Sequence, residues 1–259
     1  MLRSEFESYY KSRDYAAISD YKVDNAIILA DECFPNFSPL TDTTPKPLLK
    51  VKGEILIERM IRQLREADIS KIYVVVGYKK EMFYYLADKF GVQIVENPEY
   101  ESRSNHSSIY AVREYLGNSY ICSADTYFKQ SIFEPYVFAP YYSASFCEGK
   151  TNHYCLQTNF NNRINGIKIG GSKTWYGCEP CYWDKKFSRT LVDILEAEYD
   201  HVAIRWMHWK HFYMRHLDTL TLYIKKQPDG VVRSFESLDE LCLFDTSYIP
   251  YRNSLPQNK

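Results

Sequence analysis

A lysine held between two prolines is the first residue whose surroundings could support chemistry. Lys46 lies in Pro45-Lys46-Pro47, within a proline-rich connection that follows a short apolar run ending at Ala30. The prolines restrict the backbone, so the ammonium group can be presented to a phosphate. A solvated loop lysine remains the plainer interpretation of the same residues.

Two further loops carry residues suited to a nucleotide site. Gly77 and Tyr78 follow the apolar run 72–76, where glycine permits close backbone approach to a ligand and tyrosine offers a flat face or a hydroxyl. Asp125 follows the run 120–123, and a carboxylate there could hold Mg²⁺ bound to nucleotide phosphates. A turn-capping role would also explain Asp125.

The elements that must position these residues are predicted from hydrophobic periodicity. Short continuous apolar runs, typical of strands buried on both faces, lie at 26–30, 72–76, 92–95 and 120–122. Amphipathic helical spacing lies between them, at 56–67, 82–90 and 109–116. This alternation predicts a doubly wound, mostly parallel Rossmann-like α/β sheet. Ligands bind such sheets outside the carboxyl ends of the strands, where the loops after Ala30, Val76 and Ser123 would meet.

The rhythm of the sequence changes after about residue 140. Short alternating segments predict a small mixed β-sheet insertion, at 143–147, 154–158, 164–169 and 175–183. We expect C-terminal helices at about 186–198 and 203–216, a strand at 220–225, and a last helix whose capping box is formed by Ser237 and Glu240. The predicted organisation is an arm (1–24) with a helical stretch from Glu5 to Tyr15, one domain (25–248) and a tail (249–259).

Composition excludes several classes of function. The 32 Lys+Arg and 33 Asp+Glu give a net charge of −1, so sequence-blind nucleic-acid binding is not expected. The chain is 45% hydrophobic and 25% charged, which favours a packed core over disorder. No apolar stretch approaches the ~20 residues of a membrane span. The 24 tyrosines suit ligand pockets and interfaces.

The cysteines and histidines give no clear metal site. Seven scattered cysteines, without a readable signal peptide, predict a reducing cytoplasm. Cys178 and Cys181 form a CxxC, but no second pair completes four zinc ligands. The four histidines near the C-terminus lack acidic partners at zinc-ligand spacing, and we interpret them as ordinary surface or packing residues: His201, His208, His211 and His216.

Over residues 21–248 the chain resembles the nucleotidyltransferase family, specifically its bacterial phosphocholine cytidylyltransferase-like branch. The matching motifs are 26–30, Pro39-Leu40-Thr41, 44–49, Val75-Val76-Gly77-Tyr78, Asn97-Pro98, Asn105 with Ser108, Ala124-Asp125, Tyr182-Trp183 and 237–241. The resemblance implies that an NTP, with CTP favoured, is joined to phosphocholine or a related phosphorylated amino alcohol with release of pyrophosphate. The oligomeric state stays open.

The resemblance also implies roles for individual residues. Lys46 would neutralise phosphate charge and Asp125 would hold Mg²⁺, so that catalysis depends on positioning and electrostatics. Nucleotide binding falls to Leu29, Ala30, Asp31, Gly77, Tyr78, Asn105 and Ser108. An aromatic cage for a quaternary ammonium would use Tyr154 and Trp209, with Tyr176 and Trp183 as weaker candidates. Core packing explains Trp183 about as well.

The sequence departs from the family pattern at the phosphate loop and near the metal. Two glycines and an arginine of that loop are replaced by Glu32, Phe34 and Asn36. Glu32 and Phe34 obstruct the backbone N–H groups that would close around the triphosphate, and Glu32 adds negative charge beside it. Asn36 cannot make the bidentate phosphate contact of an arginine. Lys210 replaces an acidic metal ligand, and Glu179 replaces a glycine.

Two hypotheses therefore stand side by side. The first is an active transferase with a rebuilt phosphate loop. The second is a catalytically degenerate member that binds a nucleotide, a choline-like ligand or a partner protein without turnover. An ion pair between Lys210 and Asp125, which would fill the metal position, would favour the second.

Overall fold

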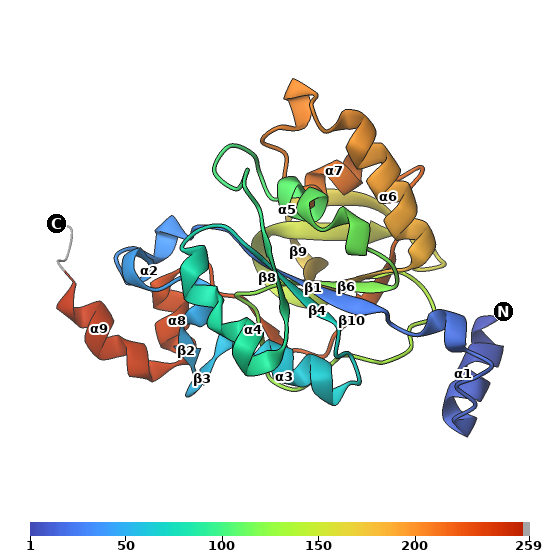
Figure 1. The fold of residues 1–259 in the computed structure, drawn as a ribbon, viewed down its shortest axis with the longest axis horizontal. Helices are drawn as coiled ribbons and strands as arrows, with labels where there is room; N and C mark the ends of the chain where they lie inside the picture. The colour runs from blue at the N-terminus through green and yellow to red at the C-terminus, as the bar shows by residue number, and fades with distance from the viewer. Residues whose placement is uncertain (256–259) are drawn as a thin grey trace.

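A seven-stranded sheet forms the centre of the computed structural model, which describes residues 1–255. Its strands are β1 (Asn25–Ala30), β4 (Ile72–Val76), β5 (Gln93–Glu96), β6 (Ser119–Ser123), β8 (Tyr141–Thr158), β9 (Ile164–Trp183) and β10 (Tyr223–Lys226). They lie in the order β10-β8-β9-β6-β1-β4-β5 (Figure 1). The pairs β6–β1, β1–β4, β4–β5 and β10–β8 are parallel, and β9 is antiparallel to both its neighbours. The predicted mostly parallel sheet is confirmed.

The strand register brings the candidate loops to one edge. Ala30 pairs with Val76, and Leu29 pairs with Ser123. The chain therefore leaves β1, β4 and β6 at the same level, because parallel strands in register end together. The segments that begin at Asp31, Gly77 and Ala124 are neighbours in space.

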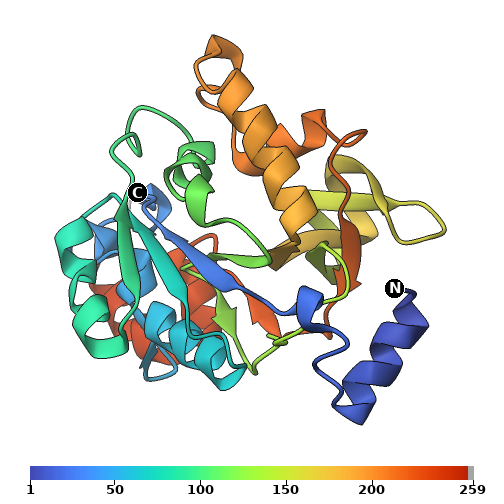
Figure 2. The ribbon, with the colours of Figure 1, turned by 45° about the vertical axis from the view of Figure 1, so that its right-hand side comes forward.

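Helices cover both faces of the sheet (Figures 1 and 2). Side chains alternate along β1, so Ile28 packs with α3 (Leu56–Glu66) and α4 (Tyr85–Phe90) on one face. Ile27 packs on the other face with α5 (His106–Ala111), α6 (Lys185–Glu198) and α7 (Trp209–Arg215). Burial on both faces explains the continuous apolar runs of the strands.

The four short segments predicted after residue 140 are parts of two long strands, β8 and β9. Several register shifts interrupt their pairing, and these breaks in alternation resemble strand ends in the sequence. Cys155 pairs with both Lys168 and Tyr176, so the ribbon folds back on itself.

The predicted helix at 203–216 is wrong in its middle. A 3₁₀ turn, η6 (Val202–Ile204), is separated from α7 by an extended residue, His208, with φ −62° and ψ 144°. His208 Nδ1 accepts a hydrogen bond from the Lys210 N–H, and Asn105 Oδ1 accepts one from the Trp209 N–H. These side chains thus accept hydrogen bonds from the first N–H groups of α7, so a new helix begins here. The spacing of apolar residues contains no information about such caps.

The remaining elements are short. The helices are α1 (Arg3–Ser12), α2 (Leu40–Thr43), α8 (Leu238–Phe244) and α9 (Ile249–Ser254), with 3₁₀ turns at η1 (Ser19–Tyr21), η2 (Pro35–Phe37), η3 (Lys46–Leu48), η4 (Lys80–Phe83), η5 (Arg113–Tyr115) and η7 (Thr246–Tyr248). Two small antiparallel sheets pair β2 (Lys50–Val51) with β3 (Glu54–Ile55) and β7 (Tyr127–Phe128) with β11 (Val232–Arg233). α1 lies at one end of the molecule, and α9 lies at the other (Figure 1).

The start of α8 follows the predicted capping box in part. Ser237 Oγ accepts from the Glu240 N–H, but the Glu240 carboxylate accepts from the Glu236 N–H rather than that of Ser237. The division into arm, domain and tail stays a prediction, and residues 256–259 of that tail lie outside the described residues.

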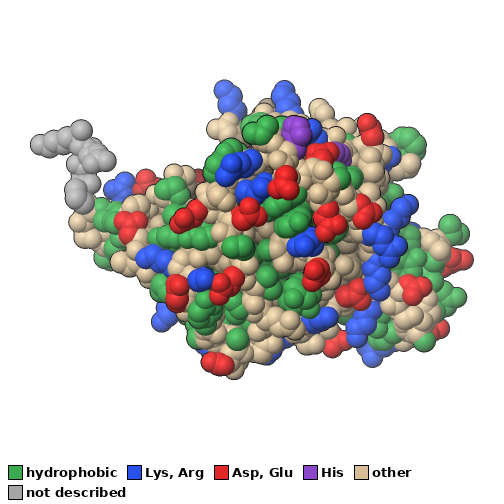
Figure 3. Space-filling view, turned by 45° about the horizontal axis from the view of Figure 1, so that its top comes forward, with side chains coloured by type: hydrophobic (Ala, Val, Ile, Leu, Met, Phe, Trp, Pro, Cys, Tyr) green, Lys and Arg blue, Asp and Glu red, His purple; other side chains and the backbone are tan. Residues whose placement is uncertain are grey.

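The surface and the thiols add little to the choice of function. Within residues 1–255, no helix has the length and apolarity needed to cross a bilayer. Basic and acidic side chains are interspersed over most of the face in Figure 3. All seven cysteines are free thiols. Cys181 is buried, and burial raises the pKa of the Cys178 thiol to about 12, so the CxxC does not form a reactive pair.

Candidate functional site

A cavity of about 390 Å³ lies at the sheet edge where the candidate loops meet. Its walls come from the loop after β1, the residues after β6, the β8–β9 ribbon and the start of α7. The lining includes Glu32, Phe34, Asn36, Lys46, Asp125, His153, Tyr154, Tyr176, Glu179, His208, Lys210, Phe235 and Glu236. The predicted convergence of Lys46 and Asp125 is therefore present, and so are all three departures in the phosphate loop.

Lys46 is fully engaged by the protein itself. Its Nζ lies 2.6 Å from Asp125 Oδ2 and donates to the Phe235 carbonyl, also at 2.6 Å. The rings of Phe34 and Phe37 each lie 4.5 Å from the same nitrogen. The Lys46 side chain is only 4% exposed, so its charge is compensated before any ligand arrives.

Lys210 pairs with Glu179 and not with Asp125, so the ion pair that would have favoured a degenerate site does not form. The Lys210 Nζ to Glu179 Oε1 distance is 3.4 Å, with side chains 17% and 8% exposed. Burial disfavours the charged ammonium, but the nearby Tyr142 and Glu179 outweigh burial and raise the pKa of Lys210. Two departures from the family pattern thus form one ion pair.

Glu32 enters the cavity from the loop that follows β1. Its side chain is open to solvent at the cavity mouth, yet protein surrounds it on most sides. Desolvation, reinforced by the charges of Asp31 and Asp125 and opposed by Lys210 and Asn105, raises the pKa of Glu32 to about 7. The carboxyl is therefore partly charged near neutral pH.

Asp31 is held by two other predicted or matching residues. Its Oδ2 accepts from Asn97 Nδ2 at 2.7 Å and from Ser108 Oγ at 2.6 Å. Burial raises the pKa of Asp31, and the two hydrogen bonds oppose that rise. Asp31 also lines a smaller cavity with Glu32 and Asn105. The network fixes the end of β1 against α5.

Asn105 links this region to α7. Its amide Nδ2 lies 2.6 Å from His208 Nε2, and its Oδ1 caps Trp209 as described above. Burial and the charge of Lys210 lower the pKa of His208 well below its usual range, so the imidazole is neutral. Sequence spacing placed His208 among ordinary residues, whereas the structure places it on the cavity wall.

None of the seven predicted nucleotide-binding residues lines this cavity. Asp31 and Asn105 line the smaller cavity, and Ser108 is buried in α5. Leu29 and Ala30 are buried strand residues. A Cβ at Gly77 would lie 2.5 Å from Cγ of Tyr100, so this glycine is needed for packing of that ring. The Tyr78 hydroxyl donates to the Thr41 carbonyl at 3.2 Å. Their roles toward a nucleotide stay predictions.

The candidate aromatics divide into two pairs. Tyr154 and Tyr176 line the cavity, and Tyr176 stacks on His153 at 4.7 Å. Trp209 and Trp183 are buried and pack edge to face at 5.4 Å in the core. The plainer interpretation of Trp183 as a core residue agrees with this packing.

Sequence reasoning missed His153, Phe235 and Glu236. His153 comes from the ribbon, and the other two precede α8, about 200 residues from the phosphate loop. No spacing rule brings such distant residues together. The ion pair between Glu179 and Lys210 had one signal in the sequence: the two departures from the family pattern introduce opposite charges.

The side chains present do not fit a magnesium ion. Mg²⁺ requires free carboxylate or water oxygens in near-octahedral geometry. Asp125 already faces the Lys46 ammonium at 2.6 Å, and a second ammonium, Lys210, lines the same cavity. Within residues 1–255 no group of three or more His, Cys, Asp and Glu side chains could hold a metal.

Comparison with known proteins identifies the class to which this fold and site belong. Residues 41–139 match the MobA-like NTP transferase domain. The chain is 33% identical over 229 residues to 2-aminoethylphosphonate cytidylyltransferase of Lancefieldella rimae, covering 87% of this chain and 93% of that protein. The chain therefore belongs to the cytidylyltransferase-like nucleotidyltransferases.

Further relatives agree with this membership. Choline-phosphate cytidylyltransferase of Streptococcus pneumoniae is 28% identical over 83% of this chain and 94% of its own length. The solved structure of the CTP:phosphocholine cytidylyltransferase of that organism aligns with a TM-score of 0.80 and 29% identity, over 83% of this chain and 95% of that one. The inositol-1-phosphate CTP transferase of T. maritima, at 18% identity and a TM-score of 0.66 over 85% and 91%, shares the fold.

Proposed function

We propose that this chain binds an organic ammonium ligand, of the choline or aminoethyl kind, in the cavity at the sheet edge without transferring a nucleotidyl group. The state of Lys46 carries the proposal. This lysine would have to meet a triphosphate, but Asp125, the Phe235 carbonyl and two phenylalanine rings already satisfy it. A phosphate would have to displace the buried Asp125 carboxylate from Lys46, and breaking a buried ion pair costs more free energy than breaking one at the surface.

The charge of the cavity favours a cation over a triphosphate. Two carboxylates are paired with the two lysines, which leaves Glu32 and Glu236 without a neutralising cation among the lining residues. Carboxylates in a partly desolvated site repel phosphate oxygens and attract ammonium groups. The rebuilt loop has thus reversed the electrostatic preference of a nucleotide site.

Aromatic side chains supply the rest of an ammonium site. Tyr154, Tyr176 and Phe34 present rings to the same cavity as Glu32. A quaternary or primary ammonium gains from ring faces and from a nearby carboxylate. The substrate names of the two relatives, choline-phosphate and 2-aminoethylphosphonate, each contain such a cation.

An active cytidylyltransferase is the second candidate, favoured by 33% identity over 93% of a relative that carries that name. In that case CTP would be joined to phosphocholine or a related phosphorylated amino alcohol, with Mg²⁺ required and pyrophosphate released.

Calorimetric titration separates the two. The protein is titrated with choline, phosphocholine, 2-aminoethylphosphonate and CTP, each with and without Mg²⁺, and pyrophosphate release is then assayed on the mixtures. We expect ammonium binding that needs no Mg²⁺, no CTP binding and no pyrophosphate. Tyr154→Leu should weaken the binding of choline, and Tyr9→Leu, an exposed change on α1, should not. CTP binding with pyrophosphate release would overturn the proposal and establish the transferase.

A further inference from the structure

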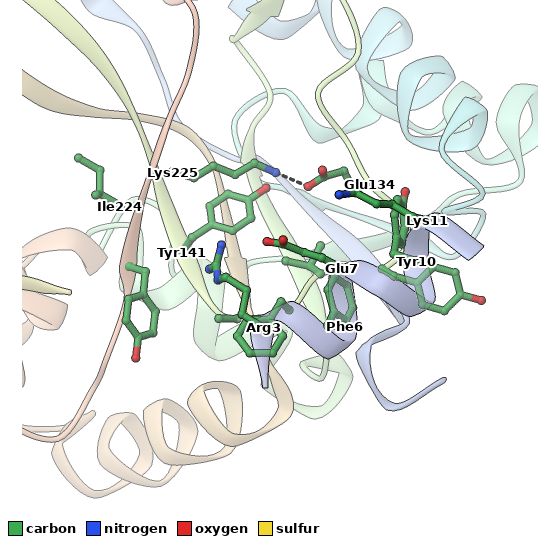
Figure 4. Close-up of a pocket in the computed structure, with 14 residues that line it drawn as sticks. Arg3, Phe6, Glu7, Tyr10, Lys11, Glu134, Tyr141, Ile224 and Lys225 are labelled. Atoms are coloured by element: carbon green, nitrogen blue, oxygen red, sulfur yellow. Dashed lines mark hydrogen bonds and ion pairs between the residues drawn. The ribbon is translucent and has the colours of Figure 1, made fainter. Parts of the chain in front are cut away.

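A second cavity, of about 300 Å³, lies between α1 and the edge strand β10 (Figure 4). None of its lining residues also lines the cavity at the sheet edge. α1 contributes Arg3, Phe6, Glu7, Tyr10 and Lys11, whose spacing places them on one helical face. Residues 134–141 and 223–225 form the opposite wall. The proposed function does not use this cavity.

Aromatic packing holds the two walls together. The Phe6 ring lies 5.1 Å from that of Tyr21 and 5.5 Å from that of Phe138. Tyr15 stacks on Tyr136 at 4.9 Å with an interplanar angle of 5°. The arm is thus fixed by contacts at both of its ends, and the cavity beneath it is already formed.

Two opposite charges in this cavity are kept apart. Arg3 and Glu7 are four residues apart on α1, a spacing that ordinarily permits an ion pair, yet neither has an ion-pair partner within residues 1–255. The Arg3 guanidinium lies over the Phe138 ring at 5.2 Å instead. In Figure 4 both heads point toward the Tyr141 ring. Lys225, by contrast, is neutralised by Glu134.

The Tyr141 ring forms part of the cavity wall beside these charges. Tyr141 is 4% exposed and lines the cavity, and its hydroxyl oxygen is itself buried. In Figure 4 that hydroxyl points toward Lys225, away from the Arg3 guanidinium. A ligand in the cavity therefore meets the ring of Tyr141.

We propose that the cavity beneath α1 binds a small zwitterion with an apolar body, such as a free α-amino acid with an apolar or aromatic side chain. The ligand carboxylate meets the Arg3 fork, and its ammonium group meets Glu7. The apolar body lies against the rings of Phe6 and Tyr10. An organic ligand of this size suits a cavity of about 300 Å³.

Titration of the full chain with L-phenylalanine tests the proposal. The matched probes are phenethylamine, which lacks the carboxylate, and 3-phenylpropionate, which lacks the ammonium group. Each should bind about tenfold or more weakly than L-phenylalanine, because each loses one charge-assisted hydrogen-bonded group. In Arg3→Gln, L-phenylalanine should bind no more tightly than phenethylamine. In Glu7→Gln, it should bind no more tightly than 3-phenylpropionate.

Tyr9→Phe on α1 and Arg13→Gln directly after α1 lie outside the cavity and should leave the affinity for L-phenylalanine unchanged. The proposal is overturned if L-phenylalanine at about 10 mM, a concentration that reveals weak small ligands, neither binds nor raises the Tm. Equal binding of the three probes, or relative affinities unchanged by Arg3→Gln and Glu7→Gln, overturns it as well.

Discussion

The buried ion pair between Lys46 and Asp125 makes a quantitative prediction about stability. Their side chains are 4% and 12% exposed, and the charged atoms lie 2.6 Å apart. Asp125→Asn leaves the Lys46 ammonium among two phenylalanine rings with only neutral oxygens, those of the new amide and of the Phe235 carbonyl, as partners. Removing one partner of a buried pair costs about 3–5 kcal/mol, and we expect that loss in the free energy of unfolding.

Removing both charges should restore most of this loss. Methionine at position 46 keeps the length of the side chain and packs well against the rings of Phe34 and Phe37. The double variant Lys46→Met/Asp125→Asn should therefore lie within about 1–2 kcal/mol of the native protein. The coupling energy between the two sites should reach about 2 kcal/mol or more, as for residues in direct contact.

Lys80 and Glu96 provide the matched control. They also lie 2.6 Å apart, but their side chains are 39% and 50% exposed. Glu96→Gln should therefore cost far less than Asp125→Asn, because solvent screens an exposed pair. Urea unfolding followed by circular dichroism gives each free energy by linear extrapolation. An Asp125→Asn variant no less stable than Glu96→Gln, or strictly additive losses in the double variant, would refute the reasoning about Lys46.

Three further predictions follow from the site. CTP affinity, measured by calorimetry, should rise when the family pattern is restored by Glu32→Gly, Phe34→Gly, Asn36→Arg, Glu179→Gly and Lys210→Asp together, and unchanged affinity would count against our account of the loop. The pKa of Glu32 is raised from 4.5 to about 7, so the folded state holds this proton more tightly than the unfolded state does. The free energy of unfolding should therefore fall as pH rises from about 4.5 to 7, and the affinity for choline should increase across pH 7. Glu32→Gln should lack both trends. Gly77→Ala should lower the free energy of unfolding by about 1–3 kcal/mol, because its Cβ would meet Tyr100. Gly149→Ala, where a Cβ has open space, should have little effect in the same urea unfolding experiment.

Periodicity predicted the sheet well because its strands are buried on both faces. The runs at 26–30 and 72–76 differ from β1 and β4 by at most one residue. The helix predicted at 203–216 is interrupted because Asn105, about 100 residues earlier in the chain, caps the Trp209 N–H and starts a new helix there. Hydrophobic spacing records which side chains are apolar but not which backbone donors another segment takes.

The location of the candidate site was predicted from the sequence, but the ion pairs within it were not. Strand ends placed Lys46 and Asp125 together, because parallel strands in register deliver their loops to one edge. Their direct contact, and the choice of Glu179 as the partner of Lys210, depend on side-chain geometry that spacing does not encode. The cavity beneath α1 was absent from the sequence interpretation, because the residues that form it carry no motif.

The ion pair between Glu179 and Lys210 also bears on how this sequence can evolve. A lysine at 210 with the glycine that the family pattern has at 179 leaves a buried ammonium unpaired, and glutamate at 179 with an acidic residue at 210 places two carboxylates together. Either single reversion thus passes through a destabilised protein. Positions 179 and 210 are therefore coupled, because a change of charge at one is tolerated only with a compensating change at the other.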